Sequence, residues 1–349
     1  LVVRNESGTG VIYAACRRNF YRGQWHGVNG LYRSVNGGSS WAQVLPNIPG
    51  SSTPYAAADI ELAADNRLWV GTQETSLSLT NRGGGRVLYS DNGTSYTLSY
   101  TVTNGERVEL ACAPNNSSYV YALTEIGGQA GEIARTTNKG STWSSRNEPA
   151  DADSGIPNTD FTRGQAWYDL IMAVDPNNAN TLIAGGIDLF RSTNGASSWS
   201  QISKWSNNNN LSALNCSYVH ADQHQIVFKP NSSSTVLFGN DGGIFYTSSL
   251  ATAATSNVIS PRNKDYNVTQ FYAAAIHPSF GSDYALAGAQ DNGTQQFTFP
   301  GSASTTQSTG GDVAFCFIDQ TNANYQLTSY IHNNSCRLTN AVSKWRPRV

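Results

Sequence analysis

The feature that most constrains the fold is a strand-rich unit that returns along the whole chain. Its clearest copy is LIMAVDPNNANTLIAGGIDLFRSTNGASSW at residues 170–199. This text predicts an apolar strand, a turn, a second apolar strand, a glycine-rich connection, a third strand and a polar turn that ends in Trp199. Four short strands in a unit of roughly 40–50 residues are typical of a β-propeller blade.

Seven copies of this unit account for almost the whole chain. We therefore expect an all-β protein, a single seven-bladed β-propeller of four-stranded antiparallel blades that spans residues 1–349. The blades are expected to start near residues 1, 59, 106, 169, 222, 271 and 312. Closing the blades into a ring leaves only short, protected strand edges.

The polar turn itself recurs with small changes. It reads SVNGGSSW at 34–41, TTNKGSTW at 136–143 and STNGASSW at 192–199, with looser copies at 89–96 and 338–345. A short Asp or Asn side chain can bond backbone N–H groups nearby, Gly supplies a positive φ, and Trp can bury its ring between sheets. We predict a structural role for the turn residues Ser34, Asn36, Trp41, Asp91, Asn138, Trp143, Asn194, Trp199, Asn340 and Trp345.

These turns resemble the Asp-box, or BNR, repeat of sialidases, sortilin-type propellers and the xyloglucanases of glycoside hydrolase family 74. The longer text that includes GQAWYD at 164, HADQH at 220, GNDGG at 239 and AQDNG at 289 is similar to sortilin-like propeller domains. Such domains occur in large secreted proteins of Bacteroidota, many of them exported by type IX secretion. The resemblance implies a piece of a larger secreted or cell-surface protein, with its signal peptide outside this chain.

Composition narrows the range of partners. Charged residues make up 13% of the chain, against about 25% in ordinary soluble domains, and Ser, Thr, Asn and Gly take their place. The net charge of −2 favours neither a nucleic-acid partner nor an anionic membrane surface, and no apolar run is long enough for a membrane span. We expect an extracellular glycan or protein as the partner.

No cofactor is predicted. The five cysteines are widely spaced and form no pair typical of zinc or redox centres, although Cys316 and Cys336 could form a disulfide. The Asp- and Asn-rich loops offer oxygen ligands, so calcium stays an open alternative.

The direction of the strands indicates where function should lie. In a four-stranded antiparallel blade, the polar turns share one face of the ring with the turns between strands one and two. Acidic and aromatic residues gather in the segments expected on the other face, around one mouth of the central channel. We predict that the ligand-binding residues are Trp167, Tyr168, Asp169, His220, Asp222, His224, Asp241, Gln290, Asp291 and Asp312.

Four of these residues, Asp169, Asp222, Asp241 and Asp291, are also candidates for catalysis. A glycosidase needs two carboxyl groups about 5–5.5 Å apart for retention or about 6.5–9.5 Å apart for inversion. Asp222 with Asp241, or Asp169 with Asp291, could form such a pair. The alternative is that the acids beside glycine only form turns.

The HADQH stretch allows a further interpretation. On a strand, His220, Asp222 and His224 would project to the same side. They could bind a transition metal there, or they could form hydrogen bonds that join neighbouring blades. No metal is predicted at this position.

No complete catalytic set accompanies the repeat. The Arg-Ile-Pro phrase of sialidases does not occur. The resemblance to family 74 implies a cleft between two propellers, whereas this chain is expected to hold one. We predict a secreted or cell-surface binding or scaffold module for a glycan or protein partner in an extracellular assembly. The alternative is a xyloglucanase-like glycoside hydrolase that uses paired Asp residues at the channel mouth.

Overall fold

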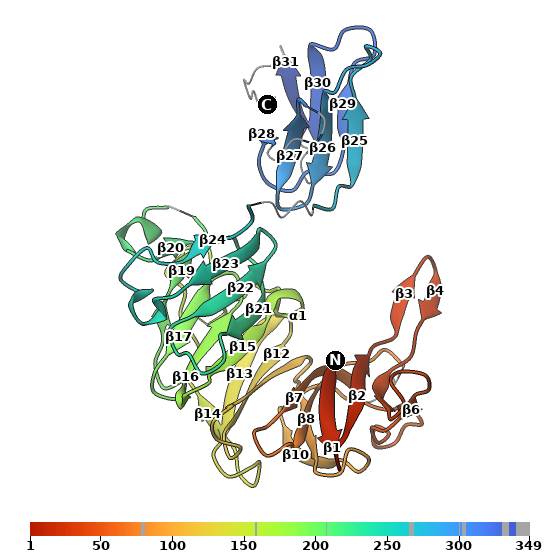
Figure 1. Ribbon diagram of the computed structural model, residues 1–349, viewed down its shortest axis with the longest axis vertical. Coiled ribbons are helices and arrows are strands. Elements are labelled where there is room, and N and C mark those ends of the chain that lie inside the picture. The colour runs from red at the N-terminus through yellow and green to blue at the C-terminus, as the bar shows by residue number, and fades with distance from the viewer. Residues whose placement is uncertain are drawn as a thin grey trace. The chain divides into compact units, whose positions relative to one another are not determined.

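The computed structural model describes residues 1–77, 81–157, 159–206, 208–264, 269–299, 301, 305–329 and 335–339. The chain divides into two compact units, one of residues 1–240 with 244–261, the other of residues 241–243 with 262–349. Each unit is described by itself (Figure 1). The prediction of one ring over residues 1–349 stays a prediction.

The first unit contains five four-stranded sheets, and in each the strands pair in sequence order. The first two sheets consist of β1 (Val2–Glu6), β2 (Thr9–Cys16), β5 (Gly30–Ser34) and β6 (Ala42–Gln43), then β7 (Ala56–Leu62), β8 (Leu68–Gln73), β9 (Arg86–Ser90) and β10 (Thr97–Thr101). The next two consist of β11 (Val108–Cys112), β12 (Val120–Ile126), β13 (Gln129–Thr136) and β14 (Ser144–Arg146), then β15 (Ile171–Asp175), β16 (Asn178–Gly185), β17 (Leu189–Ser192) and β18 (Ser200–Gln201). The fifth consists of β21 (Gln223–Phe228), β22 (Val236–Asn240), β23 (Gly243–Thr247) and β24 (Ser260–Pro261).

Smaller elements lie in the connections of this unit. A hairpin of β3 (Asn19–Tyr21) and β4 (Gln24–His26) interrupts the first sheet, and β19 (Ser203–Lys204) pairs in parallel with β20 (Ser217–Tyr218). The helices are α1 (Ala166–Asp169) and the 3₁₀ turns η1 (Leu211–Ala213) and η2 (Leu250–Thr252). None of the helices in the described ranges is long and apolar enough to cross a membrane.

The second unit repeats the pattern with two sheets. One consists of β25 (Ala273–Ile276), β26 (Ala285–Ala289), β27 (Gly293–Phe297) and β28 (Thr306–Thr309), and the other of β29 (Cys316–Ile318), β30 (Tyr325–Ser329) and β31 (Ser335–Thr339). Leu286, Cys316 and Ile318 form the buried cluster of this unit. The predicted all-β class and four-stranded antiparallel sheets are confirmed.

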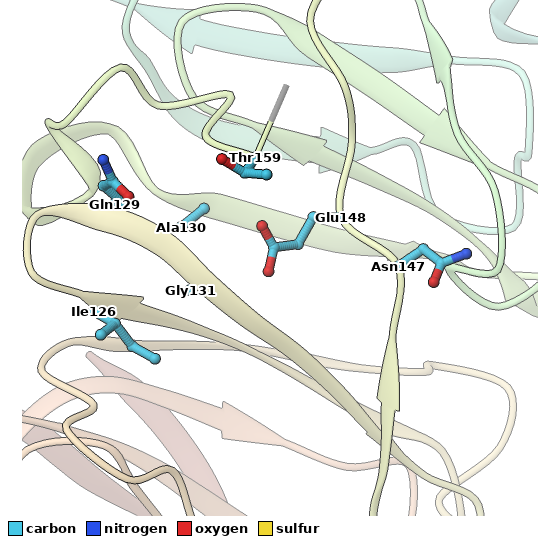
Figure 2. A pocket seen from close by; sticks show the side chains of 7 residues that line it. All are labelled: Ile126, Gln129, Ala130, Gly131, Asn147, Glu148 and Thr159. Carbon is cyan, nitrogen blue, oxygen red and sulfur yellow. The ribbon is translucent and has the colours of Figure 1, made fainter. Parts of the chain in front are cut away.

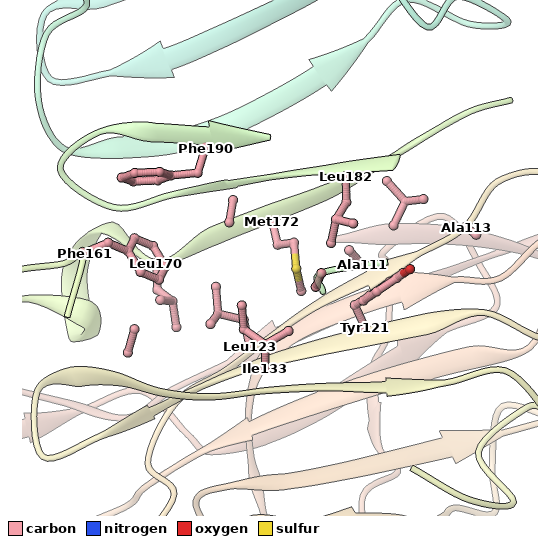
Figure 3. Close-up of a cluster of buried hydrophobic side chains, with 14 of the residues drawn as sticks. Ala111, Ala113, Tyr121, Leu123, Ile133, Phe161, Leu170, Met172, Leu182 and Phe190 are labelled. Atoms are coloured by element: carbon pink, nitrogen blue, oxygen red, sulfur yellow. The ribbon is translucent and has the colours of Figure 1, made fainter. Parts of the chain in front are cut away.

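The core of the first unit lies between successive sheets. Figure 3 shows the cluster between the third and fourth sheets, where Tyr121, Leu123 and Ile133 face Met172 and other side chains of β15 to β17. Three further clusters contain side chains of the first and second, the second and third, and the fourth and fifth sheets. Because an inner sheet is covered on both faces, strands such as β12 are buried along almost their whole length and read as continuous apolar runs.

The polar turns at 34–41, 136–143 and 192–199 share one hydrogen-bond pattern. In each, the Asn side chain accepts a bond of 2.9 Å from the backbone N–H four residues later. In each, the leading Ser or Thr hydroxyl accepts a bond from the backbone N–H at the fifth position, at 2.9–3.0 Å. That fifth residue has a positive φ in all three turns: Gly38, Gly140 and Ala196.

The tryptophans of these turns differ in their surroundings. Trp143 stacks on Tyr100 at 5.2 Å and meets Trp69 edge-on at 6.0 Å, so it packs against the preceding sheet. Trp199 donates its indole N–H to the Asn147 carbonyl at 2.7 Å, also toward the preceding sheet. Trp41 was expected to pack between blades but is 42% exposed, because no sheet of the first unit precedes its own. Asn340 and Trp345 lie outside the described residues.

Short polar bonds join each of the first four sheets to the next on the face that carries these turns, which we call the turn face. Asn66 donates to the Asn5 carbonyl at 2.7 Å, and Arg67 donates to the Lys139 carbonyl at 2.8 Å. The series continues through later sheets with bonds of 3.0–3.1 Å between Arg135 and Asn180 and between Asn177 and Ser233. Residues in and beside the turns between strands one and two thus tie neighbouring sheets together, with Lys139 of one polar turn taking part.

Candidate functional site

An exposed aromatic pair marks the candidate site of the first unit. Trp167 and Tyr168 lie on α1, in the connection from β14 to β15, on the face opposite the turn face. Their rings are 5.6 Å apart, and the side chains are 64% and 40% exposed. Large exposed rings in adjacent positions are unusual on a protein surface and typical of a binding surface.

An amide–carboxyl network, in which Asp169 is buried and Gln165 and Asp222 are partly exposed, lies beside this pair. The Gln165 side-chain N–H₂ donates to an Asp169 oxygen at 3.0 Å and to an Asp222 oxygen at 2.6 Å. Asp169 is fully buried, and its other carboxyl oxygen has no hydrogen-bond partner among the described residues. Burial, together with the nearby Asp222 charge, raises the pKa of Asp169 to about 8, so its carboxyl group is protonated at neutral pH.

This network limits what the two acids can do chemically. Both hydrogen bonds come from the same Gln165 side-chain nitrogen. The two accepting oxygens, one of Asp169 and one of Asp222, are therefore close enough to each other for a glycosidase pair. However, the Gln165 amide occupies the space between them, and Asp169 is closed off from solvent. The arrangement fixes the loop at 165–169 and offers no open position for a scissile bond.

Arg107, the residue directly before β11, supports α1. Its guanidinium donates to the backbone carbonyls of Trp167 and Tyr168 at 3.3 and 3.2 Å, and to the Leu170 carbonyl at 3.0 Å. It also pairs with Glu109 at 3.1 Å. Burial raises the pKa of Glu109 well above its ordinary value, and the Arg107 charge opposes this shift. The aromatic pair is therefore held by a rigid backbone.

The HADQH stretch adopts a conformation that the sequence did not predict. Asp222 has a φ of +65°, and β21 begins only at Gln223. His220, Asp222 and His224 therefore do not share one strand, and the prediction that they project to the same side was wrong. Over the described ranges these three do not form a group of ligands close enough for one metal ion. His224 instead packs against the Tyr168 ring at 4.7 Å, beside the aromatic pair.

The remaining predicted residues belong to the second unit. Tyr272 donates to the Gln290 side chain at 2.6 Å, and the Asp291 backbone N–H donates to Asp312 at 3.1 Å. Asp291 has a φ of +61°, and Asp241 lies in the turn between β22 and β23, so both acids occupy turns. In each predicted acid–base pair, Asp222 with Asp241 and Asp169 with Asp291, the partners come from different units.

Further acids lie on the first strands of the second and third sheets. Asp59 on β7 accepts bonds from the backbone N–H groups of Leu110 and Ile60, at 2.9 and 2.8 Å. Burial and the Asp59 charge raise the pKa of its neighbour Glu61 to about 8. Asp59 and Glu61 are partly exposed on β7, whereas Glu109 on β11 is buried.

The strands define an all-β protein built of successive four-stranded antiparallel sheets. No family model and no curated protein matches the chain. Among solved structures it is similar to the GH74 xyloglucanase from Xanthomonas campestris, with a TM-score of 0.39 and 15% identity over 84% of this chain and 45% of that chain. This chain thus spans less than half the length of that enzyme.

Two other solved structures are similar at the same level. One is YCF48 from Cyanidioschyzon merolae, with a TM-score of 0.42 and 15% identity over 87% of both chains. The other is a chain of the mitotic checkpoint complex, with a TM-score of 0.46 and 13% identity over 99% of this chain and 86% of that chain. Similarity this weak says nothing about what this chain binds.

Proposed function

We propose that this chain is a binding or scaffold module that engages an extracellular glycan or protein partner through the aromatic pair Trp167 and Tyr168. The observation that carries the proposal is the exposure of both rings on a short, fixed helix. Aromatic side chains dominate binding energies when they sit on a rigid backbone, because little conformational entropy is lost.

The support beneath the pair favours recognition over catalysis. Gln165 separates the two carboxyl groups closest to the rings, and Asp169 is neutral at pH 7 and enclosed. Arg107 uses its donors on backbone carbonyls, so it is committed to holding α1. An exposed pair of rings suits stacking on a sugar ring or packing against an apolar side chain of a partner.

The proposal also covers the wider setting of the domain. The seven sheets form one propeller with Asp-box turns, within a larger protein that is secreted or displayed at a cell surface. The low fraction of charged residues and the sortilin-like sequence text support this setting, including export by type IX secretion in a member of the Bacteroidota. Calcium in an Asp-rich loop would be detected by elemental analysis of the purified protein.

The test is an array of plant and bacterial polysaccharides and extracellular glycoproteins probed with the full chain. Trp167→Ala should weaken binding at least about tenfold, as expected when a central aromatic anchor is lost. Trp41→Ala is the matched control, because it removes an exposed tryptophan from the turn face and should leave binding unchanged.

Two results would overturn the proposal. Binding that survives Trp167→Ala and Tyr168→Ala together would show that the pair is not the contact surface. Sugar release from any polysaccharide, abolished by Asp222→Asn in a folded protein, would establish the glycoside hydrolase instead.

A further inference from the structure

A cavity of about 520 Å³ lies beside the start of β13, and none of its lining residues belongs to the aromatic pair. Its walls come from three segments: the end of β12 with the start of β13, the residues that follow β14, and Thr159. Ile126 and Ala130 give it an apolar side, while Gln129 and Thr159 supply polar groups. Figure 2 shows the Glu148 carboxylate between these segments.

Glu148 is the charged group of this cavity. It is half-buried, and no hydrogen bond or ion pair joins it to the residues that the structure describes. The two charged groups that act on it are both carboxylates, Asp160 and Glu132. Both of these have partners of their own: Asp160 accepts from the Gly164 and Thr162 backbone, and Glu132 accepts from the Tyr100 hydroxyl at 2.5 Å. Among the described residues, Glu148 is thus a carboxyl group without a partner, and the charges nearest to it are two further carboxylates.

An open strand edge borders the same cavity. β14 pairs with β13 only from Arg135 to Ile133, where Ile133 is opposite Arg146. The next residue, Asn147, leaves the sheet and donates its backbone N–H to the Ala196 carbonyl at 3.0 Å. In the described part of the chain, residues 130–132 of β13 therefore have no strand partner on this side, although the Ala130 N–H already donates to Asp160 at 3.4 Å, so the free part of the edge is Gly131 and Glu132. An extended peptide can pair with such an edge, because its backbone supplies the missing hydrogen bonds.

We propose that this cavity is a peptide-binding site, in which an extended segment of a partner protein pairs with the edge of β13 and places a lysine side chain against Glu148. The lysine stem would pack on Ile126 and Ala130, and its ammonium group would meet the unpaired carboxylate. A divalent ion is a poorer occupant, because Glu148, Glu132 and Asp160 do not form a group of ligands within reach of one ion among the described residues. The site is independent of the aromatic pair, so either proposal can fail alone.

The experiment measures binding of the fluorescent peptide Thr-Val-Lys-Val-Thr, capped at both ends, to the full chain by anisotropy. Replacing its lysine with norleucine should weaken binding about tenfold, which is the loss expected for one charge-assisted contact. Glu148→Gln should have the same effect on the lysine peptide and none on the norleucine peptide. Asp283→Asn, which removes an exposed acid of the second unit, is the matched control and should change neither.

The pH dependence gives a second readout. Burial and the two neighbouring carboxylates raise the pKa of Glu148 to about 7, so it must release a proton to receive the ammonium group at lower pH. As the pH falls below 7, affinity for the lysine peptide should fall by about tenfold in total and level off at the affinity of Glu148→Gln, in which this dependence should vanish. Equal binding of the lysine and norleucine peptides to the wild-type chain, or no binding of either, would overturn the proposal without relying on a variant that folds.

Discussion

The side-chain amide of Gln165 donates a 3.0 Å hydrogen bond to Asp169, whose carboxyl group is fully buried. Burial raises the pKa of Asp169 to about 8, so the acid beneath the exposed aromatic pair is neutral, although the bond from Gln165 by itself favours the charged form. The two residues are four positions apart, and together they shape the loop that carries Trp167 and Tyr168. Their relationship leads directly to a measurable dependence of stability on pH.

Asp169 should make the protein less stable as the pH rises. An unfolded Asp releases its proton near pH 4, whereas the folded carboxyl group keeps its proton until about pH 8. Between these values the folded state binds the extra proton, so the free energy of unfolding falls with rising pH, by at most about 1.4 kcal/mol per unit. In Asp169→Asn this contribution is absent, and the fall from pH 4.5 to pH 8 in urea unfolding should be shallower. Parallel curves for the two proteins would contradict the assignment.

Gly140 and Gly38 occupy the same position of two polar turns but have different neighbours. Both have a positive φ, so replacing either with Ala should cost about 1 kcal/mol from backbone strain. A Cβ at residue 140 would also lie 2.6 Å from the Trp69 ring, while a Cβ at residue 38 would meet the Trp41 ring at 3.6 Å, an ordinary contact. Gly140→Ala should therefore lower the free energy of unfolding by roughly 2 kcal/mol more than Gly38→Ala. Urea unfolding of both variants checks this, and equal losses would show that Trp69 moves aside freely.

Trp143 and Trp41 also form a matched pair. Trp143→Ala removes the contacts with Trp69 and Tyr100 and the hydrogen bond to Ser99, so it should cost about 2–3 kcal/mol. Trp41→Ala removes a largely exposed ring and should cost less than about 1 kcal/mol. Chemical unfolding of both variants at one pH measures the two losses of unfolding free energy. Equal losses in the two variants would contradict the prediction that Trp143 contributes more to stability than Trp41.

Local patterns in the sequence were enough to predict the strands and the polar turns. The hydrogen bonds that Asn36 and Asn138 accept span only four residues, so the local sequence of each turn determines them. The position of Trp41 could not be predicted in this way, because burial of a turn tryptophan depends on whether another sheet lies beside its own. The repeat predicts each sheet but not which neighbour it has.

The candidate site depended more on contacts between distant residues. Trp167, Tyr168 and Asp169 could be predicted as a group from their place before the first strand of the predicted blade. Gln165 and Arg107 could not, because the bond from Gln165 to Asp222 spans 57 residues and the bond from Arg107 to Leu170 spans 63. The left-handed conformation of Asp222 also had no local signal, since no glycine marks that position.

The polar bonds along the turn face have a consequence for a module that carries mechanical tension in an assembly. Successive sheets of the first unit are joined at this face by at least one short bond at each of the four junctions, including those from Asn66 to Asn5 and from Arg67 to Lys139. A force that pulls two sheets apart must break such a bond and also separate the apolar cluster between them. Tension applied along the row acts in full on every junction, because the junctions lie in series, so the row should yield first at whichever junction has the smallest apolar cluster.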